Sequence, residues 1–220
     1  MDLSLERIAL AAVPVILAIT LHEASHGYVA KLFGDRTAEM LGRVTLNPLK
    51  HIDPVGTLLV PGLLLLMSRA IGGGFVFGWA KPVPVNFANL RNPKRDMLWV
   101  AAAGPASNFA MALAWVALAV AVGQGDAGSG DALSFMARVG VQINLVLMAL
   151  NLLPIPPLDD GRIAASLLPG RAAYALSRVE PYGFFIVLAL LATGYLETLM
   201  RPFLLASQVL INAIVGAFTG

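Results

Sequence analysis

Long apolar runs constrain the fold of this chain more than any other feature of its sequence. A helix needs about 20 apolar residues to cross a bilayer. Only 13% of the 220 residues are charged, whereas soluble domains average about 25%. Candidate spans cover residues 5–30, 97–122, 135–153 and 182–196, and a final run over 203–218 either spans the membrane or lies at its surface. The runs predict an all-α polytopic membrane protein with about 4–6 transmembrane helices, in which residues 1–220 form a single membrane-embedded domain.

The absence of cysteine and the small net charge exclude several classes of function. Without cysteine the chain has no disulfides, no thiol catalysis and no thiolate ligands, so His, Asp or Glu must bind any metal. The formal net charge is only +2, and the basic residues lie between apolar runs, where they set membrane orientation. We therefore expect the lipid bilayer, and no nucleic acid, as a partner.

The charges of the loops predict the topology. Residues 31–53 and 80–96 carry four basic residues each and residues 123–135 carry none, so the positive-inside rule places the first two loops in the cytoplasm. Both lie there only if residues 54–79 enter and leave the membrane on one face. We expect a re-entrant hairpin, broken at Pro61 and at the glycines 72–74; the alternative is one more span. Alternation over residues 43–46 also predicts a short β element after the first helix.

The sequence His22-Glu23-Ala24-Ser25-His26 fits the pattern H-E-x-x-H near the end of the first apolar run. Residues four apart share one face of a helix, so both imidazoles can reach one metal ion, and Glu23 can take a proton from water that the metal activates. Zinc suits such a site. Because ionisable groups are costly inside a membrane, a functional site is favoured over the alternative, a solvated helix end at the interface.

A third protein ligand is expected from the segment that follows the run over 135–153. The candidates are Asp159 and Asp160, because a carboxylate is a normal zinc ligand and leaves a fourth position open for water. The prolines at 154, 156 and 157 force an extended chain that can cross the helix of the histidines. The alternative is that the two aspartates cap a helix before Gly161.

HEASHGYVAKLFGD and NLLPIPPLDDGR, taken together, resemble the site-2 protease family of intramembrane zinc metalloproteases. The second motif follows the family pattern N-x-x-P-x-P-x-L-D-G, except that Asp160 replaces the glycine. The segments 42–57, 78–86 and 102–108 look like the compact bacterial and archaeal branch, which lacks a PDZ or nucleotide-sensing domain.

The resemblance implies a role for each matched residue. His22, His26 and Asp159 would bind Zn2+, and Glu23 would be the general base. Asn151 holds the asparagine of the second motif, which in the family lies near the substrate.

The resemblance also implies an activity and a location. The chain would be a metalloendopeptidase that hydrolyses peptide bonds of membrane-embedded substrates in regulated intramembrane proteolysis. Its partner would be the transmembrane segment of a membrane protein substrate, with a regulatory membrane partner as a further expectation. The location would be a prokaryotic inner or plasma membrane, and the predicted topology directs the active site towards the cytoplasm.

Several alternatives remain open at this point. Asn108 either helps to polarise the scissile carbonyl or bridges helices by hydrogen bonding. His51 is either a second-layer or gating group or an ordinary loop histidine. A different H-E-x-x-H membrane protease would take a late glutamate, Glu180 or Glu197, as its third ligand. A metal-binding transporter or scaffold would spread its carboxylates through several spans.

Overall fold

The computed structural model describes residues 5–60, 63, 78, 80–123, 130–155, 158–159, 161 and 168–219. Within these ranges the chain forms helices, turns and extended loops but no strand. Four helices in the described part are long and apolar enough to cross a membrane: α1 (Leu5–Leu32), α4 (Pro93–Gly123), α5 (Gly130–Asn151) and α9 (Tyr195–Thr219). The prediction of an all-α fold with at least four helices able to span a membrane is therefore confirmed for the described residues.

The shorter elements connect these spans. They are α2 (Thr37–Met40), η1 (Pro48–Lys50), η2 (Pro54–Leu59), η3 (Phe87–Asn89), α7 (Gly170–Ser177), η4 (Glu180–Tyr182) and α8 (Gly183–Ala192). Asn47, Asp53 and Asn86 each begin a helical turn, because their side-chain oxygens accept hydrogen bonds from backbone N–H groups two or three residues later.

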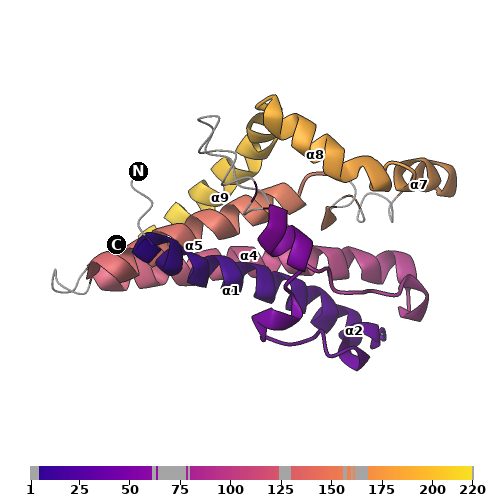
Figure 1. Ribbon diagram of the computed structural model, residues 1–220, viewed down its shortest axis with the longest axis horizontal. Helices are drawn as coiled ribbons and strands as arrows, with labels where there is room; N and C mark the ends of the chain where they lie inside the picture. The colour runs from indigo at the N-terminus through magenta and orange to yellow at the C-terminus, as the bar shows by residue number, and fades with distance from the viewer. Residues whose placement is uncertain are drawn as a thin grey trace.

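Three of the long helices, α1, α4 and α5, pack against one another and run side by side, while α9 packs against α5 and α8 packs against α9 (Figure 1). Small residues allow this close approach, as is usual between transmembrane helices. Ala18 in α1, Ala112 in α4 and Ala137 in α5 are all fully buried. At Gly140 of α5 the Trp115 ring of α4 occupies the space that a side chain would need.

An apolar core joins α9 to α5 and α8. Its buried residues are Ala149, Leu153, Val187, Leu196 and Met200. This packing holds the segment after α5, where the candidate ligand Asp159 lies, because Leu158 contacts the same core.

Two sequence predictions differ from the structure. The span predicted over 182–196 is wrong, because α8 ends at Ala192 and the chain turns at Gly194, whose positive φ of 76° suits glycine. The apolar run over 203–218 belongs instead to α9. The strand predicted over 43–46 is not formed; the Arg43 side chain there donates to the Lys81 carbonyl oxygen at 2.6 Å.

The predicted re-entrant hairpin falls mostly outside the described residues. Of residues 54–79, the structure describes only 54–60, 63 and 78. Pro54–Leu59 forms a helical turn.

An extended segment, residues 80–86, returns from this region and is fastened to the end of α1. Asp35, fully buried just after α1, accepts hydrogen bonds from the backbone N–H groups of Thr37 and Asn86 and from the Asn89 side chain, at 3.0, 2.6 and 3.2 Å. Burial raises the pKa of the Asp35 carboxyl, but these hydrogen bonds lower it more, and the net pKa is below its usual value. The anchored segment lies beside the candidate site.

Candidate metal centre

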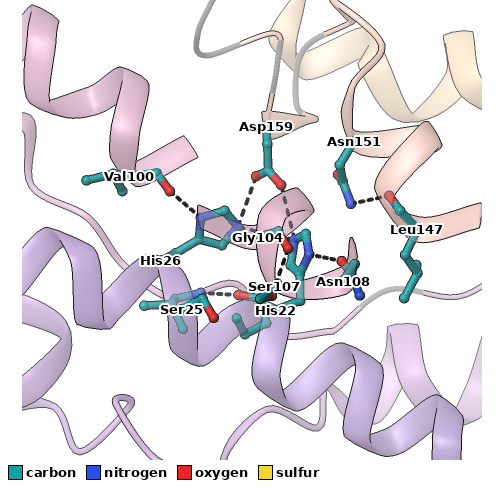
Figure 2. A network of polar contacts seen from close by, with 12 residues as sticks. His22, Ser25, His26, Val100, Gly104, Ser107, Asn108, Leu147, Asn151 and Asp159 are labelled. Atoms are coloured by element: carbon teal, nitrogen blue, oxygen red, sulfur yellow. Dashed lines mark hydrogen bonds and ion pairs between the residues drawn. The ribbon is translucent and has the colours of Figure 1, made fainter. Parts of the chain in front are cut away.

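Two histidines on one face of α1 meet one aspartate from the segment that follows α5. The Nε2 atoms of His22 and His26 are 3.2 Å apart. Asp159 Oδ2 lies 3.1 Å from His22 Nε2, and Asp159 Oδ1 lies 3.2 Å from His26 Nε2 (Figure 2). Both histidines are buried. The structure thus brings together the three side chains that the sequence nominated as metal ligands.

The other ring nitrogen of each histidine is held by α4. Asn108 Oδ1 lies 2.5 Å from His22 Nδ1, and the Val100 carbonyl oxygen lies 2.7 Å from His26 Nδ1. Because both partners are oxygen acceptors, both Nδ1 atoms carry a proton, and in the neutral form of each ring the proton is therefore on Nδ1. The Nε2 atoms then carry lone pairs, which is the form that binds a metal.

The convergence of lone pairs fits a divalent cation. Two unprotonated nitrogens and a carboxylate would repel one another across about 3 Å unless a positive charge lay between them. Ligand atoms held about 2.0–2.1 Å from a tetrahedral zinc ion are roughly 3.3 Å apart, close to the separations observed. Asp159 Oδ2 is buried and has no hydrogen-bond donor among the described residues. The donor set and its spacing therefore fit zinc.

Asp159 is ionised in this setting. Burial raises the pKa of its carboxyl, but without an ion the hydrogen bonds and positive charge that the facing His22 and His26 rings can offer lower it more, and the net pKa is below its usual value. A cation bound in their place acts in the same direction. The side chain is 15% exposed. The centre therefore supplies one full negative charge to a bound cation, together with two neutral nitrogens.

The helix α4 approaches the two rings at Gly104. A Cβ atom placed there would lie 2.5 Å from both His22 Cε1 and His26 Nε2, closer than real contacts allow. Only glycine lets the α4 backbone pass this close to the imidazoles. The following Pro105 lies inside α4 without ending it, as membrane helices tolerate when their neighbours pack closely.

Glu23, the candidate base, is half-buried beside the ligands and lines a cavity of about 560 Å³. Its Oε2 accepts a hydrogen bond from the Val83 N–H at 2.7 Å. The extended segment 80–86 therefore contacts the base directly, and Val83 and Val85 form part of the same cavity wall.

The cavity joins the metal ligands to an apolar space between helices. Leu147, Leu150, Leu158, Phe184 and Val187 contribute apolar walls. The polar groups of the lining include His22, His26, Asp159 and Glu23, so the cavity pairs apolar walls with a small set of polar side chains.

The remaining predicted residues lie at different distances from this centre. Asn151 lines the cavity, and its amide donates to the Leu147 carbonyl oxygen at 3.1 Å. Asn108 is fully buried and does not line the cavity. His51 is buried away from the ligand group, and its Nε2 donates to the Thr45 carbonyl oxygen at 3.0 Å. Asp160 lies outside the described residues.

Sequence reasoning missed three contributors. The Val100 carbonyl and the Val83 N–H are backbone groups, so no residue type marks them. Gly104 had a visible signal, the Gly-Pro pair inside an apolar run, but nothing in the sequence indicated that both histidine rings lie against it.

Comparison with known proteins found related sequences. The chain is 38% identical over 200 residues to "Putative zinc metalloprotease YwhC" of Bacillus subtilis strain 168, which covers 89% of this chain and 86% of the relative. It is 34% identical over 183 residues to "Putative zinc metalloprotease Rip2" of Mycolicibacterium smegmatis, which covers 83% of this chain and 66% of the relative. The Rip2 protein of Mycobacterium tuberculosis strain H37Rv is 28% identical over 179 residues. No family model and no solved structure matches the chain.

Proposed function

Because this chain belongs to the site-2 protease-type family of zinc metalloproteases that includes YwhC and Rip2, we propose that it hydrolyses peptide bonds of membrane-embedded substrates. Its cofactor is zinc, for which His22, His26 and Asp159 are the ligands. The observation that carries the proposal is the meeting of these three side chains, with Glu23 beside them, at an apolar cavity among helices long enough to span a membrane.

Bound zinc would polarise the scissile carbonyl and activate a water molecule as the nucleophile. Glu23 takes the proton of that water as its oxygen attacks the carbonyl carbon, and then gives the proton to the leaving nitrogen as the C–N bond breaks. The Val83 N–H holds the Glu23 carboxylate in place through Oε2, which leaves Oε1 for the proton. The apolar walls keep other water away from the reacting atoms.

The shape of the site favours an unwound substrate. Helical hydrogen bonds shield a peptide backbone, so a transmembrane substrate has to open before a carbonyl can reach the ligands. The extended segment 80–86 borders the cavity beside Glu23. Its backbone edge for a substrate is short, because the Lys81, Val83 and Asn86 N–H groups donate to the His51 carbonyl oxygen, Glu23 and Asp35, and Pro82 and Pro84 carry no N–H. We propose that the opened substrate pairs with this edge, in the manner of strand addition, with Asn151 contacting it from the opposite wall.

The proposal extends to the setting of the enzyme. Residues 1–220 act as one membrane domain, and the basic loops direct the active site towards the cytoplasm of a prokaryotic plasma membrane. The substrate is a membrane protein, and cleavage releases a fragment in regulated intramembrane proteolysis. Access is controlled by the membrane domain, by a membrane partner or by an earlier cut in the substrate.

The test compares the wild-type chain with Glu23→Gln in a bacterial membrane. Glu23→Gln keeps the ligands but removes the base, so uncut substrates should accumulate and co-purify with it. Quantitative mass spectrometry of membrane and soluble fractions then maps each cut that depends on Glu23. Glu197→Gln is the matched control, because Glu197 lies exposed near the start of α9 and is not part of the ligand group.

Two results would contradict the proposal. A Glu23→Gln protein that binds zinc and still cleaves at the wild-type rate would remove Glu23 from the base role. Cuts that depend on Glu23 but fall only outside transmembrane segments would argue against intramembrane proteolysis. Loss of zinc in Glu197→Gln would instead favour a metalloprotease of a different type, in which a late glutamate is the third ligand.

A further inference from the structure

A chain of buried amides crosses three helices and ends on the His22 ring. Asn108 in α4 and Asn144 in α5 are both fully buried inside spans. Asn144 Nδ2 donates to the Gly140 carbonyl oxygen at 2.8 Å, and Asn108 Nδ2 donates to Asn144 Oδ1 at 2.9 Å. Asn108 Oδ1 then accepts from His22 Nδ1 at 2.5 Å (Figure 2). The chain therefore joins a metal ligand in α1 to a backbone carbonyl in α5.

The direction of this chain of hydrogen bonds is set by one group, the Gly140 carbonyl. A backbone carbonyl only accepts hydrogen bonds, so the Asn144 NH2 group must face Gly140 and its oxygen must face Asn108. The Asn108 NH2 group must then face Asn144, which turns its oxygen to His22. An oxygen at that position requires a proton on His22 Nδ1 and leaves Nε2 bare for the metal.

The surrounding packing keeps the two amide groups in this orientation. Trp115 of α4 lies against Gly140, where a side chain would overlap its ring, so the α4 and α5 backbones are held close together. The polar groups are remote from water, and a reversed amide would bring two donors or two acceptors face to face at a high cost in a low dielectric. Asn108 Nδ2 also lies 3.5 Å from the Ala18 carbonyl oxygen, which again favours the same orientation.

We propose that Asn144, which does not touch the metal centre, is a positioning residue that fixes the protonated nitrogen of His22 through the orientation of Asn108. The proposal rests on the role of His22 as a zinc ligand in the proposed function. The two histidines differ in this respect. His26 donates directly to the Val100 backbone carbonyl, so its protonation pattern does not depend on any side chain of the amide chain.

The test replaces Asn144 and reads the histidine rings and the metal separately. Asn144→Leu keeps the approximate volume but removes the orienting groups, so the Asn108 amide becomes free to reverse. Zinc binding, measured by competition with a chromophoric chelator in detergent or nanodiscs, should weaken by about 10–100-fold, as is usual when an outer partner of a ligand is lost. The matched control is Asn212→Leu, an exposed asparagine in the span of α9, which should bind zinc as the wild type does.

A spectroscopic readout separates positioning from general damage. The chain has only three histidines, so selective 15N labelling of histidine gives a spectrum simple enough to assign. In the Asn144→Leu protein, His22 should show a population, absent from the wild type, that has lost the proton on Nδ1, while His26 should keep its proton on Nδ1. A merely structural role of Asn144 would disturb both rings alike.

A second variant keeps the proposal testable if Asn144→Leu does not fold. Asn144→Ser retains the direction, because a helical serine hydroxyl donates to the carbonyl four residues earlier, here that of Gly140, and can accept from Asn108. Its zinc affinity should lie within a few-fold of the wild type, with His22 still protonated on Nδ1. The proposal is overturned if folded Asn144→Leu binds zinc normally, if its His22 keeps the wild-type pattern, or if Asn144→Ser reverses the His22 ring proton. Proteolysis enters none of these measurements, so their failure is distinct from that of the proposed function.

Discussion

The close approach of the α4 backbone at Gly104 to the two histidine rings gives the sharpest prediction, which concerns Gly104→Ala. The added methyl group would lie 2.5 Å from His22 Cε1 and from His26 Nε2 and 2.6 Å from His26 Cε1, whereas ordinary van der Waals contact begins at 3.4 Å. The rings or the α4 backbone must therefore move apart by about 0.9 Å. The rings cannot move freely, because Asn108 and the Val100 carbonyl hold their Nδ1 atoms.

The size of the effect follows from that displacement. A misplacement of about 1 Å at a reacting centre costs roughly 100-fold in rate, which corresponds to about 2.7 kcal/mol of barrier. Zinc affinity should fall as well, because the methyl group overlaps a ligand atom, His26 Nε2. Overpacking of a well-packed core adds a destabilisation of about 1–3 kcal/mol.

The assay measures zinc affinity, thermal stability and cleavage of a transmembrane substrate in the same preparations. The control is Gly216→Ala in α9, where an added Cβ meets nothing within 4 Å, so all three quantities should stay near wild type. A Gly104→Ala protein that binds zinc and cleaves as the wild type does would refute the geometry described for the two rings. A protein that loses stability but retains zinc affinity would refute the claim that the methyl group acts on the ligands.

Three further predictions test separate parts of the structure. Asp159→Asn should weaken zinc binding by more than the roughly 10–100-fold caused by loss of an outer partner, measured by chelator competition; unchanged zinc content would exclude Asp159 as a ligand. Gly140→Ala should destabilise the chain by about 1–3 kcal/mol, because the new methyl group overlaps the ring of Trp115. In thermal unfolding, Gly140→Ala should cost less stability when it is made in a Trp115→Leu protein than in the wild type. An equal cost in both would contradict the assigned overlap. The folded-state pKa of Asp35 lies below its ordinary value, so its contribution to stability is present above the ordinary pKa near 3.8 and is lost as the pH falls through the folded value. Chemical unfolding against pH should show that loss in the wild type and not in Asp35→Asn, and an equal acid sensitivity of the two would argue against the predicted hydrogen-bonded carboxylate.

The ligand residues were predictable because their chemistry is unusual for their surroundings. His22, Glu23 and His26 are ionisable groups in an apolar run, and Asp159 follows a run of prolines that cannot continue a helix. Their meeting in space required that the segment after α5 come back to α1. The predicted extended chain there is wrong in the described residues, which instead form successive turns, with Leu158 N–H donating to the Ile155 carbonyl oxygen and Gly161 N–H to that of Leu158.

The partners of those residues were less accessible to sequence reasoning. Asn108 was predicted either to polarise a carbonyl or to bridge helices, and the geometry favours the second, because its oxygen faces His22 and its NH2 group faces Asn144. The Val83 N–H beside Glu23 depends on where the segment 80–86 lies, which no local pattern specifies.

The helical spans were predicted from the lengths of the apolar runs. The errors arose where a run contains a glycine that ends a helix, and where a few alternating residues suggested a strand. The break between α8 and α9 at Gly194 interrupts an apolar stretch that reads as continuous in composition. The alternation over 43–46 is too short to specify a strand, and the buried Arg43 side chain there bonds to the Lys81 backbone instead.

The hydrogen bonds from α4 to the two imidazoles have a consequence for how the protein responds to zinc supply in the cell. The orientation of the rings comes from Val100 and Asn108 rather than from an ion, so a protein stripped by a chelator would keep its helices and the two rings in place, in contrast to zinc fingers, which unfold without metal, and only the Asp159 carboxylate would have to shift or accept a proton from a ring. Scarcity of zinc would then silence the enzyme without exposing it to quality-control proteases. Restored zinc would reactivate the existing molecules, and no new synthesis would be needed.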